Sequence, residues 1–218
     1  MIMIDLSLDI DNECMTCGTK WHEKVCIKPL GKINEVGRNT HSILLGSHSG
    51  THVDAPLHFF EDMKGIDQLD LAQICGDVTV IDLTYIKQGD CVKIEDVTGI
   101  TPSERMIFRF DWFKRWKTVE YYTKFPYFSM ESVQYLVERG MRVMALDTPS
   151  PDNGSAIMQI EDSLIHKYLL KRGIVIIEYL SNTDQLETNK QYQLFALPIK
   201  VKDCDGAPAR VVAVEKEC

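Results

Sequence analysis

Residues 46–60 read GSHSGTHVDAPLHFF, and this segment decides how the rest of the chain is interpreted. It places His48, His52, Asp54 and His58 within eleven positions, although the whole chain has only six histidines. In an extended chain alternate side chains point to the same face, and these four positions are all even-numbered. The segment therefore predicts a cluster of imidazole and carboxylate groups on one side of the backbone.

The spacing within this cluster suits a metal ion better than a helix. Gly50 and Pro56 disfavour a helix across the segment. In an extended chain the Cα atoms of His52 and Asp54 would lie about 6.6 Å apart, near enough to share one ion, whereas His48 would lie about 13 Å from His52. A bend at Gly50 would bring His48 back. Two imidazoles and a carboxylate that leave one position open are the ligand set of a catalytic zinc.

Three predicted strands end in an acidic residue, at Asp82, Asp147 and Glu178. Sites in open α/β sheets lie outside the carboxyl ends of strands, so these acids are candidates for chemistry. We expect Asp82 to face a loop and to bind nearby amides. Glu178 differs because Tyr179 and Leu180 continue the apolar run beyond it. Burying this carboxylate alone would cost several kcal/mol, so we expect it to be paired or to ligate a cation.

Short runs rich in β-branched residues predict strands, and helical patterns between some of them predict a mixed α/β fold. The predicted strands are Ile2–Leu6, Ser42–Leu45, Val78–Leu83, Met106–Phe110, Val143–Leu146, Ile174–Ile177 and Val211–Val214. The chain has no internal repeat, low-complexity tract or linker-like stretch. We therefore expect a single domain over residues 1–218.

Two helices have recognisable ends. Ser129 is a suitable N-cap for a helix through Val137, and Gly140 would end it. A second helix through Leu170 would be capped by Asp162 or Ser163 and would lead directly into the strand at 174.

The composition excludes several classes of protein. Hydrophobic residues make up 44% of the chain and charged residues 26%, which is typical of a globular protein. The net charge of −8 argues against a nucleic-acid partner. Apolar runs such as residues 173–177 are too short to span a membrane, and residues 1–5 do not resemble a signal peptide. We therefore expect a cytoplasmic protein that binds neither nucleic acid nor membranes.

The seven cysteines are an odd number and favour reduced thiols over a disulfide framework. Cys14 and Cys17 form the one local CxxC pair. A zinc ribbon would need a second such pair, and a thioredoxin-like site should open a helix after a strand. Incidental thiols are therefore the favoured interpretation.

The stretch His48-Ser-Gly-Thr-His52-Val-Asp54-Ala-Pro-Leu-His58-Phe resembles the HxGTHxDxPxHF signature of the cyclase family of metal-dependent hydrolases, which includes bacterial kynurenine formamidase and isatin hydrolase. Further family-like segments extend the resemblance over most of the chain: Asp5-Leu6-Ser7, Trp112 to Trp116 with Glu120-Tyr121-Tyr122, Asp147-Thr-Pro-Ser, and Gly206-Ala-Pro-Ala-Arg210. The resemblance implies the family's swivelling β/β/α fold.

The resemblance also implies the metal ligands. The first metal site would use His48, His52 and Asp54. The second would share Asp54 as a bridge and add His166 and Glu178, which stand twelve residues apart as in the family. Taken alone, His166 would be read as an exposed histidine of a helix. The implied cofactor is a divalent metal, with two ions per subunit, zinc as first choice and manganese next.

His58 corresponds to the family's proposed acid–base residue rather than to a ligand. A metal lowers the pKa of a coordinated water from 15.7 to about 7, so that the water can attack an amide carbonyl. With an unperturbed pKa of about 6.5, His58 can take the water's proton and pass it to the leaving nitrogen.

Three hypotheses about function remain open. The first is an arylformamidase-type hydrolase of a small non-peptide amide, with N-formylkynurenine first among the substrates. The second is a hydrolase of a cyclic amide or lactone of the isatin type, which would share the mechanism. The third is a non-catalytic member that binds metal or a small ligand, and the presence of His58 counts against it.

Substrate and assembly are less determined by the residues. Residues 14–22 lack the proline-containing stretch usual in the family, and Trp21 and His22 either replace it or pack on a neighbouring loop. Candidates to line a pocket for an aryl group, or else to pack in the core or an interface, are Phe59, Phe60, Trp112, Trp116, Tyr121 and Tyr122. The resemblance implies a homodimer or homotetramer.

Overall fold

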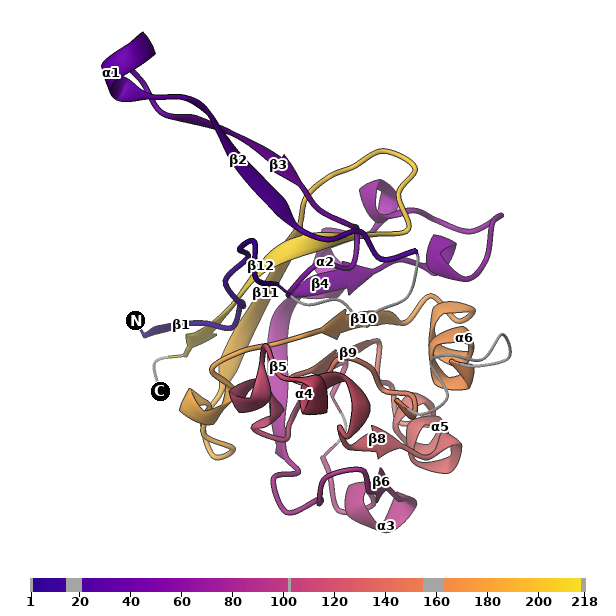
Figure 1. The fold of residues 1–218 in the computed structure, drawn as a ribbon. Helices are drawn as coiled ribbons and strands as arrows, with labels where there is room; N and C mark the ends of the chain where they lie inside the picture. Colours follow the sequence, from indigo (N-terminus) through magenta and orange to yellow (C-terminus); the bar gives the residue numbers. More distant parts are fainter. Residues whose placement is uncertain (1, 15–20, 102, 155–162, 217–218) are drawn as a thin grey trace.

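The computed structural model describes residues 2–14, 21–101, 103–154 and 163–216. Its main sheet has the strand order β1-β12-β11-β5-β7-β9-β10-β4, and β4 also pairs with β12. The seven strands from β12 to β4 therefore close into a barrel, and β1 extends the sheet along β12 (Figure 1). In chain order these strands are β1 (Met3–Asp5), β4 (His52–Asp54), β5 (Cys75–Asp82), β7 (Arg105–Arg109), β9 (Val143–Leu146), β10 (Val175–Glu178), β11 (Tyr192–Pro198) and β12 (Gly206–Glu215).

Side chains of the four strands β5, β7, β9 and β10 alternate between two hydrophobic clusters. Strands β5, β7, β9 and β10 are parallel neighbours and the remaining pairings are antiparallel. On β7, Ile107 joins a cluster to which all seven barrel strands contribute, so this cluster fills the barrel interior. Met106 and Phe108 point the other way, into a cluster shared with the helices. This alternation explains why both faces of the parallel strands are apolar.

Four helices lie on the side of the parallel strands (Figure 1). They are α3 (Ile94–Val97), α4 (Val119–Thr123), α5 (Met130–Glu138) and α6 (Leu164–Leu170), with a small parallel pair of strands, β6 (Cys91–Val92) and β8 (Tyr127–Phe128). The short helix α2 (Leu71–Ile74) instead contacts β11 and β5, and its Ile74 joins the cluster inside the barrel. Ser129 caps α5 by accepting a hydrogen bond from the Ser132 backbone, which confirms the predicted cap. The side chain of Ser163 does not cap α6, and Asp162 lies outside the described residues.

A two-stranded arm projects away from the barrel (Figure 1). It consists of β2 (Cys26–Gly31) and β3 (Thr40–Leu44), which pair antiparallel, with the short helix α1 (Ile33–Val36) at its tip. All five residues of β3 are exposed, and α1 has no buried residue. The arm thus contributes little to the core of the chain to which it belongs.

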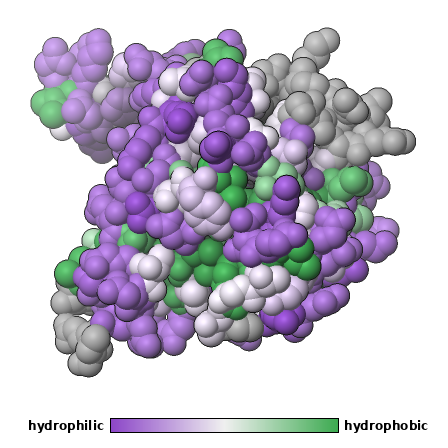
Figure 2. Space-filling model, turned by 90° about the horizontal axis from the view of Figure 1, so that it is seen from below, coloured by the Kyte–Doolittle hydropathy of each residue, from purple (hydrophilic) through white to green (hydrophobic). Residues whose placement is uncertain are grey.

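Each of the seven strands predicted from the sequence overlaps an observed strand, and both predicted helices are present. The mixed α/β class is therefore confirmed. Strands β2, β4, β6, β8 and β11 were not among the predictions. No helix in the described residues is long and apolar enough to cross a membrane. Viewed from below, hydrophobic side chains gather across the middle of a face that is otherwise mainly hydrophilic (Figure 2).

Candidate metal centre

Strand β4 carries the centre of the site because it lies between β10 and β12 in the barrel. His52 and Asp54 are two residues apart on this strand, so they share a face. His52 stands directly opposite Glu178 of β10, and cross-strand partners also share a face. The Nε2 atom of His52 lies 3.3 Å from an Asp54 oxygen and 3.3 Å from a Glu178 oxygen.

His48 reaches the same point because the chain turns back before β4. Gly50 has a φ of 62°, a left-handed conformation that glycine adopts without strain. The turn places Nδ1 of His48 at 2.8 Å from Oδ1 of Asp54, so the bend expected at Gly50 is present. On the other side, a Cβ added to Gly206 would lie only 3.0 Å from Cε1 of His48. Glycine at 206 is thus needed for β12 to pass this close to the imidazole.

Helix α6 supplies the third imidazole. Nε2 of His166 lies 3.1 Å from Oε1 of Glu178 and 3.4 Å from Oδ2 of Asp54. Its other ring nitrogen, Nδ1, donates a hydrogen bond to Asp152 at 2.7 Å. The Asp152 carboxylate also accepts hydrogen bonds from the backbone amides of Ile165 and His166. The same carboxylate therefore caps helix α6 and orients the His166 ring.

The five side chains expected to bind metal are therefore brought together. Four of them are buried, and the His48 side chain is only 10% exposed. Among the described residues, four buried atoms of this cluster have no hydrogen-bond partner: His52 Nε2, both Asp54 carboxylate oxygens and Glu178 Oε1. Such atoms are costly to bury unless a cation satisfies them. The cluster combines imidazole and carboxylate and therefore fits a divalent metal.

Without a cation, the imidazoles and carboxylates of the cluster stabilise each other's charged forms. Burial lowers the pKa of His52, but the adjacent carboxylates of Asp54 and Glu178 outweigh burial and raise the pKa to about 10. Burial raises the pKa of Asp54, yet the neighbouring histidines hold that pKa well below 3.8. Because metal ligation needs neutral imidazole and ionised carboxylate, binding of a cation here would release protons.

His58 lies beside this cluster, in the single 3₁₀ turn Pro56–His58 that follows β4. Its ring centroid is 4.1 Å from that of His48, and Nδ1 is 3.0 Å from Oδ2 of Asp205. Potential metal-ligand atoms of His48, Asp54 and His58 all lie within 4.8 Å of one another. The position of His58 is therefore compatible with metal ligation as well as with proton transfer. The His58 side chain is 25% exposed, more than those of the five expected ligands.

Sequence reasoning missed two aspartates of this site. Asp152 binds His166, and Asp205 binds both His48 and His58. Asp205 directly precedes the Gly206 to Arg210 segment that was singled out, and Asp152 follows the Asp147-Thr-Pro-Ser segment. Their proximity to those segments was the available signal, but neither lies at a spacing that indicates a ligand.

Residues 4–153 match the family described as putative cyclase. The chain belongs to this family. Kynurenine formamidase of Bacillus mycoides (strain KBAB4) is 31% identical over 184 residues, which cover 84% of this chain and 80% of that protein.

Solved structures share the fold. Isatin hydrolase A from Labrenzia aggregata, bound to benzyl benzoate, has a TM-score of 0.84 at 24% identity and covers 97% of this chain and 93% of its own. A potential metal-dependent hydrolase with cyclase activity has a TM-score of 0.79 at 23% identity, and the match covers 100% of this chain and 99% of that one. The fold expected from the resemblance is confirmed.

In this member of the cyclase family, aromatic side chains border the metal centre. The Phe59 ring centroid lies 4.5 Å from that of His58 and 5.6 Å from that of His166. The Tyr179 ring lies 5.2 Å from that of His52 and joins a cluster that includes three of the predicted residues, Trp116, Tyr121 and Tyr122. Tyr179 has a φ of 59°, a strained conformation that follows directly on Glu178.

Trp112 and Phe60 have structural roles instead. Trp112 is buried, and its indole N–H donates to the Tyr121 carbonyl oxygen, so it belongs to the core. Phe60 packs against the hydrophobic cluster that the parallel strands share with the helices.

Residues 14–22 depart from the family pattern, and the last of them, His22, reaches the site. His22 lies beside His48, with ring centroids 6.1 Å apart. Burial, together with the neighbouring His48, lowers the pKa of His22 to about 4. Trp21 is 74% exposed and does not pack in the core. Cys17 lies outside the described residues, so the structure does not test the CxxC pair.

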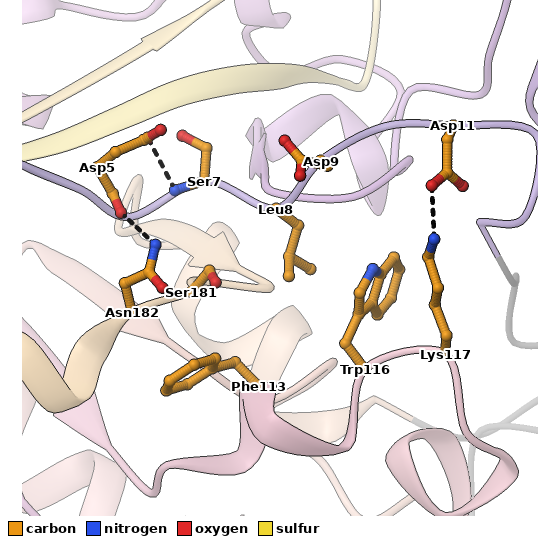
Figure 3. Close-up of a pocket in the computed structure, with 10 residues that line it drawn as sticks. All are labelled: Asp5, Ser7, Leu8, Asp9, Asp11, Phe113, Trp116, Lys117, Ser181 and Asn182. Carbon is orange, nitrogen blue, oxygen red and sulfur yellow. Dashed lines mark hydrogen bonds and ion pairs between the residues drawn. The ribbon is translucent and has the colours of Figure 1, made fainter.

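A pocket of about 470 Å³ lies between the start of the chain and the turn that contains Trp116 (Figure 3). Asp5, Asp9 and Asp11 line one side, and Lys117 forms an ion pair with Asp11. Trp116 lines this pocket and also contacts Tyr179. Trp116 thus connects the lining of this pocket with Tyr179, whose ring lies 5.2 Å from that of His52.

The other two strand-terminal acids have structural partners. Asp82 is exposed and accepts hydrogen bonds from the amide and hydroxyl of Thr84, as expected for a residue facing a loop. Asp147 is fully buried and accepts hydrogen bonds from the Phe110 amide and the Thr183 hydroxyl. It thus links two loops at the end of β9.

Proposed function

We propose that the chain is a metal-dependent hydrolase of a small non-peptide amide, with an arylformamidase reaction on N-formylkynurenine as the leading case. The observation that carries this proposal is the convergence of buried, unpartnered imidazole and carboxylate atoms beside the more exposed His58. The names of the curated relatives agree with a hydrolase acting on C–N bonds other than peptide bonds.

The proposed metal ligands are His48, His52, Asp54, His166 and Glu178. The two oxygens of Asp54 face different histidines, His48 and His52 on one side and His166 on the other, which supports two ions bridged by this residue. Zinc is the first candidate and manganese the next, because both accept this ligand set. When bound, such a cation lowers the pKa of water and polarises a carbonyl.

His58 is the proposed acid–base residue. Its Nδ1 is engaged by Asp205, so Nε2 is the nitrogen left to exchange protons with the reactants. As water adds to the amide carbon, Nε2 accepts the proton that water loses. The same proton then passes to the leaving nitrogen as the C–N bond breaks, so His58 ends the cycle unchanged.

The aromatic surroundings support an aryl substrate. Phe59 lies beside His166 and Tyr179 beside His52, and each of these ring centroids is within 6 Å of the centroid of the proposed ligand. A cyclic amide or lactone of the isatin type is the alternative substrate, because the same residues would open a ring as readily as they cleave a formamide. A purely metal-binding role would not need a hydrogen-bonded histidine that is more exposed than all five proposed ligands.

We further propose a homo-oligomer whose contacts include the β2–β3 arm. An isolated two-stranded hairpin is marginally stable in water, and Leu30, Ile33 and Ile43 of this arm are each more than 60% exposed. The arm carries Lys28, Lys32 and Arg38 against the single carboxylate of Glu35, whereas the whole chain has a net charge of −8. A second copy of this chain offers the complementary acidic body, so we assign the arm to that partner.

The single domain expected over residues 1–218 is supported by the pairing of β1 with β12, which joins both ends of the chain in one sheet. The cytoplasmic location stays a prediction from the sequence.

The test of the proposed reaction compares two substrates. The purified chain, equilibrated with zinc or with manganese, is incubated with N-formylkynurenine and with isatin, and product formation is followed for each. We expect hydrolysis of N-formylkynurenine to be the faster reaction. Faster opening of isatin would select the alternative substrate. Metal-bound protein that hydrolyses neither compound, nor any other member of a broad amide panel, would overturn the proposal.

A further inference from the structure

Asp205 lies where two functional histidines meet. It precedes β12, and its Oδ2 is 2.7 Å from Nε2 of His48 and 3.0 Å from Nδ1 of His58. One carboxylate oxygen therefore accepts hydrogen bonds from two imidazole rings that come from different turns of the chain. No other carboxylate among the described residues has a hydrogen bond to both of these rings.

The hydrogen-bond chemistry of a carboxylate determines which ring nitrogens carry hydrogen. An ionised carboxylate only accepts, so both contacting nitrogens must donate. His48 then holds N–H at Nε2 and presents Nδ1 to Asp54, the side on which the metal ligands gather. His58 holds N–H at Nδ1 and is left with Nε2 for proton exchange. The two rings thus donate to Asp205 through different nitrogens, Nε2 in His48 and Nδ1 in His58, and the same carboxylate oxygen sets the tautomer of each ring.

The backbone around Asp205 holds the carboxylate in this position. Its carbonyl oxygen accepts a hydrogen bond from the Ala55 amide at 2.9 Å, and the next residue, Gly206, pairs with Asp54 in the β12–β4 ladder. The preceding Cys204 carbonyl accepts from the Ile66 amide at 2.8 Å. Asp205 is thus anchored to the same strand that carries the metal ligands, although its side chain is 36% exposed.

We propose that Asp205 is a positioning residue that sets the tautomers of His48 and His58 together, the first for metal binding and the second for proton transfer. The proposal rests on the function proposed above for these two histidines. Removing a carboxylate that hydrogen-bonds a metal ligand, without itself binding the metal, commonly lowers metal affinity or activity by 10–100-fold. The Asp205 carboxylate would therefore couple the metal site to the acid–base residue.

The test uses Asp205→Asn with Asp203→Asn as the matched control. Asn keeps the shape of Asp205 but loses its charge, so the group that faces the two rings is either a neutral and weaker acceptor or an N–H donor. Asp203 lies in the same loop and undergoes the same change of charge, and its exposed carboxylate lies near Lys202. Three experiments are made: calorimetric titration for zinc affinity, NMR for the ¹⁵N shifts of the ring nitrogens in zinc-loaded protein, and steady-state kinetics for kcat and KM with the amide substrate.

We expect Asp205→Asn to weaken zinc binding about 10–100-fold and to lower kcat by a similar factor, with KM near its wild-type value. The ¹⁵N shifts should show His58 moving from the Nδ1–H to the Nε2–H tautomer. In a His58→Ala background with saturating zinc, Asp205→Asn should cause no further loss of kcat. Asp205→Glu should restore the Nδ1–H signal, and Asp203→Asn should match the wild type in every measurement.

Unchanged ¹⁵N shifts and zinc affinity in Asp205→Asn would overturn the inference, as would losses of kcat that add fully to those of His58→Ala. The zinc titration and the ¹⁵N shifts need no substrate. They would therefore still decide the role of Asp205 if the wild-type protein hydrolysed no amide and the proposed function failed.

Discussion

His52 and Glu178 stand opposite each other in the antiparallel pairing of β4 and β10, with Nε2 3.3 Å from Oε2. The sheet thus brings a buried imidazole and a buried carboxylate to one point from distant parts of the chain. Neither His52 Nε2 nor Glu178 Oε1 has a hydrogen-bond partner among the described residues. A divalent cation bound at this point would satisfy both atoms, and this relationship is the basis of the first prediction.

Glu178→Gln removes the charge and keeps the shape of the side chain. We expect zinc affinity to fall by more than about 100-fold, because an amide is a much weaker ligand than a carboxylate and losing even an outer partner costs 10–100-fold. Calorimetric zinc titration measures this. The exposed Glu187, changed to Gln, is the control and should bind zinc like the wild type. Equal affinities in both variants would exclude Glu178 as a ligand.

Removal of metal should destabilise the fold. A cation that binds only the folded state, present at 100 times its dissociation constant, stabilises it by about 2.7 kcal/mol. For a domain of this size that corresponds to a shift of about 5–11 °C in Tm. Thermal unfolding with zinc and after dialysis against a chelator should show this shift, and Glu178→Gln should largely lose it. A Tm that does not respond to chelation would contradict a bound cation.

Asp147 gives the protein a pH dependence that is independent of metal. Burial raises its pKa from 3.8 to about 7, although Thr183 and Phe110 donate hydrogen bonds that lower it. Between pH 4 and 7 the unfolded chain releases this proton while the folded chain keeps it, so the free energy of unfolding falls as the pH rises. The loss attributable to Asp147 is at most about 4 kcal/mol.

Asp147→Asn should remove this part of the pH dependence. Denaturant unfolding of metal-free wild type and variant from pH 4 to 8 measures it, since the histidines contribute equally to both proteins. The wild type should lose stability relative to Asp147→Asn as the pH rises through this window. Parallel curves would show that Asp147 is already ionised in the folded protein at pH 4.

The arm predicts the state of assembly. Replacing the exposed Leu30 and Ile43 together by Lys should disrupt the oligomer, because both side chains would be buried against the second copy. Light scattering coupled to size-exclusion chromatography should show the mass falling to that of a monomer. Leu71→Lys is the control, since Leu71 is similarly exposed but lies on α2 of the body. A wild-type chain that is monomeric at micromolar concentration would exclude this role for the arm.

Much of the fold was readable from the sequence because the parallel strands are buried on both faces. Val143–Leu146 is entirely apolar, and its predicted bounds match the observed strand. Strand β11 escaped prediction because Gln193 interrupts its apolar residues and Pro198 ends it. The three residues of β4 were recognised as an extended segment of histidine and aspartate, yet their place between β10 and β12 depends on long-range pairing.

The site shows the same division between local and long-range information. Parity along the chain predicts that His52 and Asp54 share a face, and Gly50 predicts the turn that returns His48. The apolar surroundings of Glu178 predict a partner but do not identify it. Asp152 and Asp205 act through a helix start and a barrel register that no local spacing encodes, so they became visible only in the folded chain.

Zinc content in two variants tests the central claim most directly. Wild type, Asp54→Ala and His58→Ala are purified, equilibrated with zinc, freed of excess metal and analysed for bound zinc and for turnover. We expect His58→Ala to hold as much zinc as the wild type while turnover falls about 10²–10⁴-fold. Asp54→Ala should lose both zinc and turnover. Zinc retained in full by Asp54→Ala, or lost from His58→Ala, would contradict the assigned roles.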